Sequence, residues 1–151
     1  MMFGRALLGA VLMMAGATTG QALRAEESYI YAPGGVALSG YDAVSYFQAG
    51  RPIKGRPAYA LMWRGAAWYF ASPETLAMFE MNPEAYAPQF GGYCAYSVAE
   101  GAAGPAEPDA FVIKGGKLYM MHDRSLRDRT NGQIVVIIHD AEAKWPAVLD
   151  K

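Results

Sequence analysis

The stretch WRGAAWYFASPETLAMFEMNP, Trp63 to Pro83, contains the clearest fold signals in this 151-residue chain. Aromatic runs on both sides of Arg64-Gly65 predict two strands, Tyr59 to Trp63 and Ala67 to Ala71, joined in a hairpin. Glycine suits the turn between them because it adopts a positive φ without strain. Ser72-Pro73-Glu74 then predicts a helix start, since it combines a capping hydroxyl, a proline at the first helical position and an acid in the first turn.

A second hairpin is predicted further along the chain. Ala110 to Lys114 and Lys117 to Met121 have strand-like composition, and Gly115-Gly116 between them favours a tight turn. We expect the two hairpins to form one small antiparallel sheet with helices packed on it. The sequence therefore predicts an α+β fold.

Helices are predicted around the hairpins from caps and chain breakers. Asp42 is expected to cap a short helix, because its side chain can accept from free backbone N–H groups. The run Ile134 to Ile138 also fits a strand by β-branching, but the polar residues after it favour a helix. Tyr29 to Tyr31 is predicted as a short strand. The predicted helices are Ala43 to Gln48, the helix that starts after Ser72 and stops by Asn82-Pro83, Pro83 to Tyr86, Tyr93 to Glu100 and Gln133 to Lys144.

The first residues predict an exported protein. Arg5 precedes an apolar run from Ala6 to Ala17, and small and polar residues follow that run. This order is typical of a secretory signal peptide, and the run is shorter than the roughly 20 residues of a membrane-spanning helix. We expect a signal peptide at residues 1–25, cleaved near Ala22 or Ala25, and a periplasmic mature protein.

The mature chain, residues 26–151, has the length of one domain. The whole chain has 14 acidic and 13 basic residues, without a run of Lys or Arg. Nucleic-acid binding is therefore not expected, because phosphate contacts need clustered cations. A membrane span is not expected in the mature chain either, since an apolar run such as Ile134 to Ile138 is far too short.

The segment GGYCAYS, residues 91–97, holds the only cysteine of the chain. Exported proteins usually pair their cysteines, and Cys94 has no partner in its own chain. Four roles are open to this residue. It can be a buried apolar residue, half of an intermolecular disulfide, a reactive thiol or a metal ligand.

Four segments carry a resemblance to a known family. They are GYDAVSYFQAG, WRGAAWYFASPETLAMFEMNPEAYAPQFGGYCAYS, DAFVIKGGKLYMM and AKWP, and the match runs from about Val36 to Leu149. Together they resemble the exported YHS-domain proteins of bacteria. This resemblance implies a small, single α+β domain related to treble-clef-like metal-binding domains. It also implies an association with metals, because short YHS domains occur beside copper and heavy-metal transport ATPases.

The sequence departs from the metal-type relatives at Ser45, Ala71 and Thr75, where those relatives carry cysteine. Serine, alanine and threonine do not replace thiolates for a soft metal. The family's histidine is also absent from residues 59–72. The resemblance therefore transfers the scaffold rather than the metal site. The scaffold residues that match are Asp42, Tyr69, Phe70, Ser72, Phe79, Pro83 and Tyr86.

A different set of soft ligands is present in this chain. His122 and Met120 lie at the end of the second hairpin, where strand alternation is expected to place them on one face and Met121 on the other. Cysteine, histidine and methionine together suit Cu(I). We predict a soft-metal site, with copper as the metal, formed by Cys94 with help from His122 or Met120. A protein partner would then donate or accept the metal.

Two other functions stay open. The first is a metal-free binding module, in which exposed aromatic residues around Gly91-Gly92 engage a protein or a small ligand. The second is a thiol enzyme, in which Cys94 would be the nucleophile and His122 the base. An enzyme is the less expected of the two, because no third, orienting residue is recognisable and no catalytic residue is assigned.

Overall fold

The aromatic run around Arg64-Gly65 forms the first hairpin of the computed structural model, which describes residues 28–151. Strands β1 (Arg56–Trp63) and β2 (Ala66–Phe70) are antiparallel and are joined by a two-residue turn. Both turn residues have a positive φ, 48° and 77°, as a tight hairpin turn requires. Every second side chain of β2 is buried, so one face of this hairpin points into the core.

The second hairpin is also where the sequence predicts it. Strands β3 (Phe111–Lys114) and β4 (Lys117–Met120) pair across Gly115-Gly116. The α+β fold class is therefore confirmed, with two small antiparallel hairpins and packed helices. One detail is corrected: we expected a single sheet, but each hairpin is a separate two-stranded sheet.

Each hairpin gains one isolated bridge from another segment of the chain. Val36 forms a single bridge with Ala67 on the outer edge of β2, and Cys94 forms one with Met120 on the outer edge of β4. The two hairpins contact each other through side chains rather than through backbone pairing, because Leu118 and Met120 of β4 lie in the same core as β2.

Helix α2 (Pro73–Met81) begins and ends as the sequence predicts. Ser72 caps it, because its Oγ accepts from the Thr75 N–H at 3.2 Å. Asn82 ends the helix, and the short helix α3 (Pro83–Tyr86) follows directly. Phe79, on the inner side of α2, is completely buried.

The other predicted helices are present with shorter bounds. Helix α1 (Ser45–Gln48) starts two residues late, and α4 (Ala95–Ala99) is shorter at both ends than predicted. Helix α6 (Ile134–Lys144) confirms the helical choice for the β-branched run, because its buried residues recur at helical spacing. Tyr29 to Tyr31 is not a strand. Instead, the Tyr31 N–H donates to the Gly91 carbonyl at 2.9 Å.

Helix α5 (Arg124–Thr130) was not predicted. Asp123 caps it, with Oδ1 accepting from the Leu126 N–H at 2.7 Å. That N–H, and then His122, hold the pKa of Asp123 below its usual value. Short 3-10 turns complete the structure: η1 (Pro33–Gly35), η2 (Ala37–Gly40), η3 (Gln89–Gly92), η4 (Asn131–Gln133) and η5 (Ala147–Asp150).

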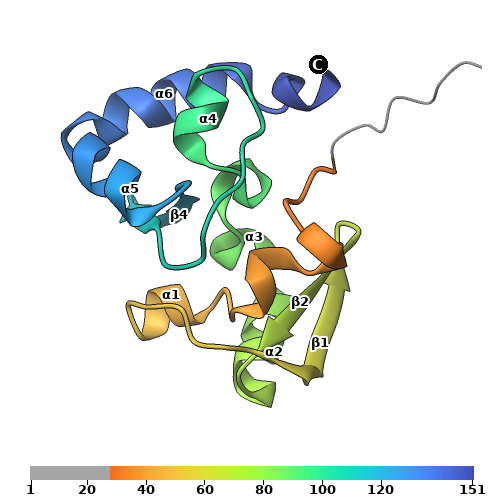
Figure 1. Cartoon of the computed structure of the whole chain (residues 1–151). Coiled ribbons are helices and arrows are strands. Elements are labelled where there is room, and N and C mark those ends of the chain that lie inside the picture. The colour runs from red at the N-terminus through yellow and green to blue at the C-terminus, as the bar shows by residue number, and fades with distance from the viewer. Residues whose placement is uncertain (1–27) are drawn as a thin grey trace, which may run out of the picture.

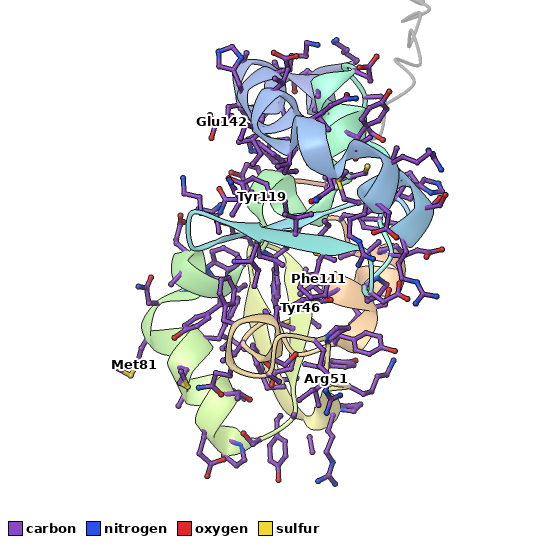
Figure 2. All side chains as sticks on the ribbon, turned by 90° about the vertical axis from the view of Figure 1, so that its left-hand side faces the viewer. Tyr46, Arg51, Met81, Phe111, Tyr119 and Glu142 are labelled. Atoms are coloured by element: carbon purple, nitrogen blue, oxygen red, sulfur yellow. The ribbon has the colours of Figure 1, made fainter. Side chains whose placement is uncertain are left out.

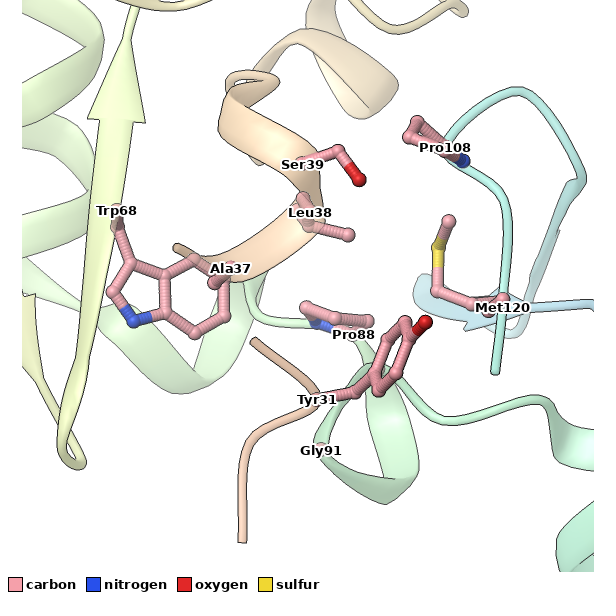
Figure 3. A pocket seen from close by; sticks show the side chains of 11 residues that line it. Tyr31, Ala37, Leu38, Ser39, Trp68, Pro88, Gly91, Pro108 and Met120 are labelled. Atoms are coloured by element: carbon pink, nitrogen blue, oxygen red, sulfur yellow. The ribbon is translucent and has the colours of Figure 1, made fainter. Parts of the chain in front are cut away.

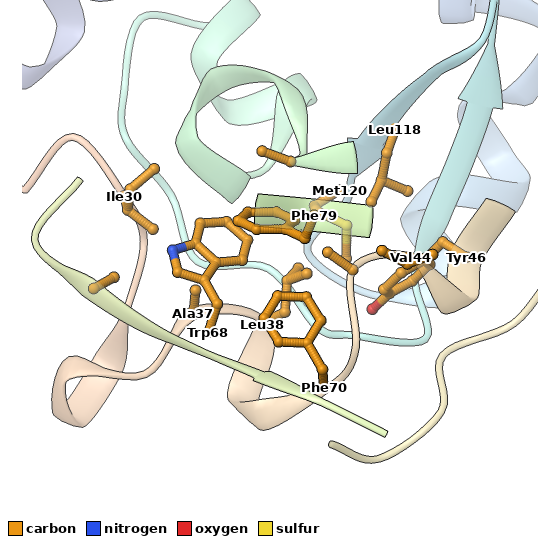
Figure 4. Packing of buried hydrophobic residues seen from close by; sticks show 13 residues of the cluster. Ile30, Ala37, Leu38, Val44, Tyr46, Trp68, Phe70, Phe79, Leu118 and Met120 are labelled. Carbon is orange, nitrogen blue, oxygen red and sulfur yellow. The ribbon is translucent and has the colours of Figure 1, made fainter. Parts of the chain in front are cut away.

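The second hairpin separates two hydrophobic cores. Leu118 and Met120 face the first core, which fills the space between the first hairpin, α1 and α2 (Figure 4). Tyr119 and Met121 face the second core, under α4 and α6. Figure 1 shows α4 and α6 on one side of β4 and the first hairpin with α2 on the other. In Figure 2, Tyr119 lies above the second hairpin and Phe111 below it.

Two sequence predictions concern membranes and export. Between residues 28 and 151, the structure contains no helix long and apolar enough to cross a membrane. The predicted signal peptide at residues 1–25 lies outside the described residues.

Candidate functional site

Cys94 lies directly before α4 and is completely buried. Its N–H donates to the Gly104 carbonyl at 3.0 Å, and its backbone forms the bridge to Met120. Because no part of the residue is exposed, a metal or reagent reaches the thiol only if the surrounding structure opens. Of the four roles open from the sequence, the folded structure favours the buried apolar residue.

The two other predicted metal ligands point in different directions. Met120 is buried in the first core. His122 is more than half exposed, and its Nδ1 lies 3.1 Å from Oδ2 of Asp123. Strand β4 ends at Met120, so the alternation that would have placed both side chains on one face stops there. Within residues 28–151, no three His, Cys, Asp or Glu side chains are grouped so that they could hold a metal ion.

The three positions at which the sequence departs from the metal-type YHS pattern meet around Asp42. Ser45 Oγ donates to the Asp42 carbonyl at 2.6 Å. The Ala71 N–H and Thr75 Oγ1 donate to Asp42 Oδ2 at 2.9 and 2.6 Å. The Val44 N–H donates to Oδ1 at 2.9 Å. These positions therefore form a hydrogen-bonded centre around a buried carboxyl group, which joins α1 to the start of α2.

The most site-like feature of the described chain is a cleft of about 230 Å³ beside the Gly91-Gly92 loop. Four chain segments form it: residues 29–30, the turn of the first hairpin, residues 84–91 and the end of α6. Its aromatic lining consists of Tyr29, Trp63, Phe90 and Trp145. We call it the aromatic cleft.

Contacts between the rings hold the walls of the aromatic cleft together. The rings of Tyr29 and Trp145 meet edge to face, 5.2 Å between centres, and the indole N–H of Trp145 donates to the Tyr29 hydroxyl at 3.4 Å. Phe90 packs against Trp145 at 6.1 Å. Trp63 packs on Phe79 of the first core at 5.6 Å. Each wall is therefore fixed by packing that extends into the folded core.

Glycine at position 91 lets two walls of the aromatic cleft approach closely. A Cβ added to Gly91 would lie 1.9 Å from the Tyr29 carbonyl oxygen and 3.2 Å from the Trp145 ring. The φ of Gly91 is +62°, and that of the neighbouring Phe90 is +55°, a conformation that non-glycine residues rarely adopt. Unfavourable backbone conformations of this kind cluster at binding and catalytic sites.

Charged groups line one part of the aromatic cleft. The guanidinium of Arg64 lies over the rings of Tyr29 and Trp63, 4.9 and 4.6 Å from their centres. The same group pairs with Glu84. Glu142 of α6 also lines the cleft, and together with burial it raises the pKa of Tyr119, with burial as the larger cause.

Two other hollows are less suited to a ligand. The first, of about 10 Å³, lies between Leu38, Pro88 and Met120, and is about the size of one water molecule (Figure 3). The second, of about 270 Å³, is an open depression between the second hairpin and Val135 and Ile138 of α6. It contains Lys114 and Lys117 but no carboxylate.

Sequence reasoning found part of the aromatic cleft. It named exposed aromatic residues around Gly91-Gly92, but it missed Tyr29, Arg64 and Trp145 as site residues. Arg64 follows Trp63 directly in the chain, but no local signal places its side chain over the ring of Tyr29. Tyr29 and Trp145 are 116 positions apart, and no local pattern connects them.

Comparisons of the chain with protein-family models, with curated proteins and with solved structures found no match. The resemblance to the exported YHS-domain proteins therefore stays a prediction. The fold and the site define the class of this protein as a small α+β domain with an aromatic cleft.

Proposed function

We propose that this protein is a binding module that holds a small, ring-bearing ligand in the aromatic cleft without a metal. The observation that carries this proposal is that four chain segments converge on a hollow walled by Tyr29, Trp63, Phe90 and Trp145. Small-molecule sites are concave and largely apolar, with a few polar groups that orient the ligand. The aromatic cleft is concave and has four aromatic walls, although its exposed lining is more polar than apolar; the carboxylates of Glu84 and Glu142 are among its polar groups.

The size of the aromatic cleft limits the ligand. A cavity of about 150 Å³ holds one benzene ring. The aromatic cleft, at about 230 Å³, therefore has room for a single ring with one small substituent. Stacking on Trp145 or Tyr29 would hold such a ring, because offset and edge-to-face aromatic contacts are favourable.

The test uses three probes that share a phenyl ring: benzyl alcohol, benzyltrimethylammonium and phenylacetate. We expect at least one to bind at millimolar concentration and to change the tryptophan fluorescence, because Trp63 and Trp145 line the cleft. Tyr29→Ala is expected to weaken that binding about tenfold, the loss of one aromatic contact. Tyr59→Ala is the matched control, since Tyr59 is a half-buried tyrosine beneath Arg56 outside the cleft. If no probe binds, the proposal is wrong.

The soft-metal site predicted from the sequence is a second candidate, because the bridge between Cys94 and Met120 brings a thiol residue and a thioether residue side by side. Copper would have to enter through local opening, since both residues are buried. If this candidate holds, Cu(I) titration followed by native mass spectrometry gives a stoichiometric adduct that Cys94→Ala abolishes. Met81→Ala, at a highly exposed methionine, should keep the adduct. Absence of an adduct at micromolar Cu(I) rules out the metal function.

Family and location form part of the same proposal. We infer an exported, periplasmic YHS-like protein from the first 25 residues and from the four quoted segments, and these inferences are supported by the sequence alone. Export would place the aromatic cleft in a compartment where small molecules that enter from outside the cell are present.

A further inference from the structure

Arg64 shows what kind of group the aromatic cleft accommodates. Its guanidinium lies over two ring faces, those of Tyr29 and Trp63, and its Nη2 donates to Oε1 of Glu84. Aromatic faces attract cations because the ring quadrupole is negative at the face. The protein therefore already contains one cation held by two rings and one carboxylate.

The charges that line the aromatic cleft favour a cationic ligand. Its charged lining groups are Arg64, Glu84 and Glu142. Arg64 is paired with Glu84. Glu142, in contrast, makes no ion pair within the part of the chain that the structure describes. An anionic ligand would approach two carboxylates and the negative faces of the rings, whereas a cationic ligand would find a carboxylate that is not paired.

We propose that the aromatic cleft selects an organic cation, a quaternary ammonium or guanidinium group attached to a ring, and that Arg64 is a tethered competitor which the ligand displaces. This inference rests on the proposed function and adds the ligand class to it. The cationic group takes the place of the Arg64 guanidinium over Tyr29 and Trp63, and Glu84 and Glu142 balance its charge.

Displacement of Arg64 requires little rearrangement. Its side chain is 39% exposed and Glu84 is 69% exposed, so the pair lies at the surface, where ion pairs are weak. Arg64 belongs to a two-residue turn, and its side chain can swing into solvent while the hairpin stays paired. A ligand therefore competes only with one exposed ion pair and two cation–π contacts.

The order of binding among the three phenyl probes tests the ligand class. We expect benzyltrimethylammonium to bind at least about fivefold more tightly than benzyl alcohol, the contribution of a cation–π contact, and phenylacetate to bind most weakly. Equal or tighter binding of benzyl alcohol or phenylacetate would overturn the cation proposal while leaving the binding module intact. If none of the probes binds, both proposals fail.

Two substitutions test the residues. Arg64→Ala removes the competitor, and we expect it to tighten benzyltrimethylammonium binding about fivefold. Its control, Arg51→Ala, changes an exposed arginine outside the cleft and should have no effect.

Glu142→Gln should weaken benzyltrimethylammonium binding about threefold. Its control, Glu80→Gln, lies on the exposed side of α2 and should not weaken binding. Melting temperatures show whether each variant is folded. Weaker binding by a folded Arg64→Ala variant would contradict the displacement of Arg64.

Discussion

Replacing Asp42 by alanine is expected to lower the free energy of unfolding by about 3 to 5 kcal/mol. The Asp42 carboxyl group is completely buried and accepts from the Val44 N–H, the Ala71 N–H and the Thr75 hydroxyl. Alanine would leave the Val44 and Ala71 N–H groups without their acceptor, and the Thr75 hydroxyl would keep only its longer contacts with Ser72, of which that with the carbonyl is 3.2 Å. A buried donor that loses its partner costs about 1 to 3 kcal/mol, so the two lost N–H bonds and the weakened hydroxyl bond together explain the size of the effect.

Asparagine at position 42 tests whether the side chain stabilises the fold by its volume or by accepting hydrogen bonds. Asp42→Asn keeps the side-chain volume but places an NH₂ group against one of the donors. We expect the free energy of unfolding to fall by about 2 kcal/mol, an intermediate loss, because one hydrogen bond is replaced by two donors that face each other. Urea unfolding followed by tryptophan fluorescence measures both variants. Asp128→Ala is the control, because Asp128 is exposed and pairs with the neighbouring Arg127, and its effect should be small. An Asp42→Ala variant as stable as Asp128→Ala would show that α1 and α2 do not depend on this carboxyl group.

Gly91→Ala is expected to destabilise the fold by about 3 kcal/mol or more, because it combines a steric collision with a positive φ that alanine rarely adopts. The added Cβ would lie 1.9 Å from the Tyr29 carbonyl oxygen, and backbone cannot move aside as a flexible side chain can. The hydrogen bond from Tyr31 N–H to the Gly91 carbonyl would be lost with the contact. Because Tyr29 forms one wall of the aromatic cleft, the variant should also lose probe binding.

Gly115→Ala provides a matched comparison for this prediction. Gly115 also has a positive φ, +58°, but nothing lies within 4 Å of the position of an added Cβ. Its substitution therefore reports only the backbone preference of glycine, about 1 kcal/mol. The difference between the two variants in thermal or urea unfolding isolates the collision with Tyr29. Equal losses would mean that residues 28–31 do not dock against η3 in solution.

Local signals in the sequence predicted most of the secondary structure. Ser72-Pro73 and Asn82-Pro83 set the bounds of α2 because a cap, a proline and a breaker act within a few residues. Gly65 and Gly116 marked the hairpin turns for the same local reason. Helix α5 was missed although Asp123 is a capping residue, because the segment after it, RSLRDRT, is mostly polar and shows no helical repeat of apolar residues.

Pairing between distant segments was harder to predict. The expected single sheet assumed that two neighbouring hairpins would share an edge. Instead each hairpin is a separate sheet, and the single bridges that Val36 and Cys94 add to β2 and β4 have no sequence pattern. The Cys94 prediction illustrates a related limit: a lone cysteine has the same sequence whether it is buried or exposed, and only packing decides between a core residue and a ligand.

Short-range signals in the sequence were enough to predict the two hairpins, helix α2 and the helical state of Ile134–Lys144, because caps, turn glycines and residue spacing act over short distances. The folded structure was needed to show that Tyr29, Arg64, Glu84 and Trp145 line one cleft and that Cys94 is buried. These features depend on contacts between segments far apart in the chain. Such contacts form when hydrophobic burial brings distant segments together into the two cores. No single stretch of residues specifies them.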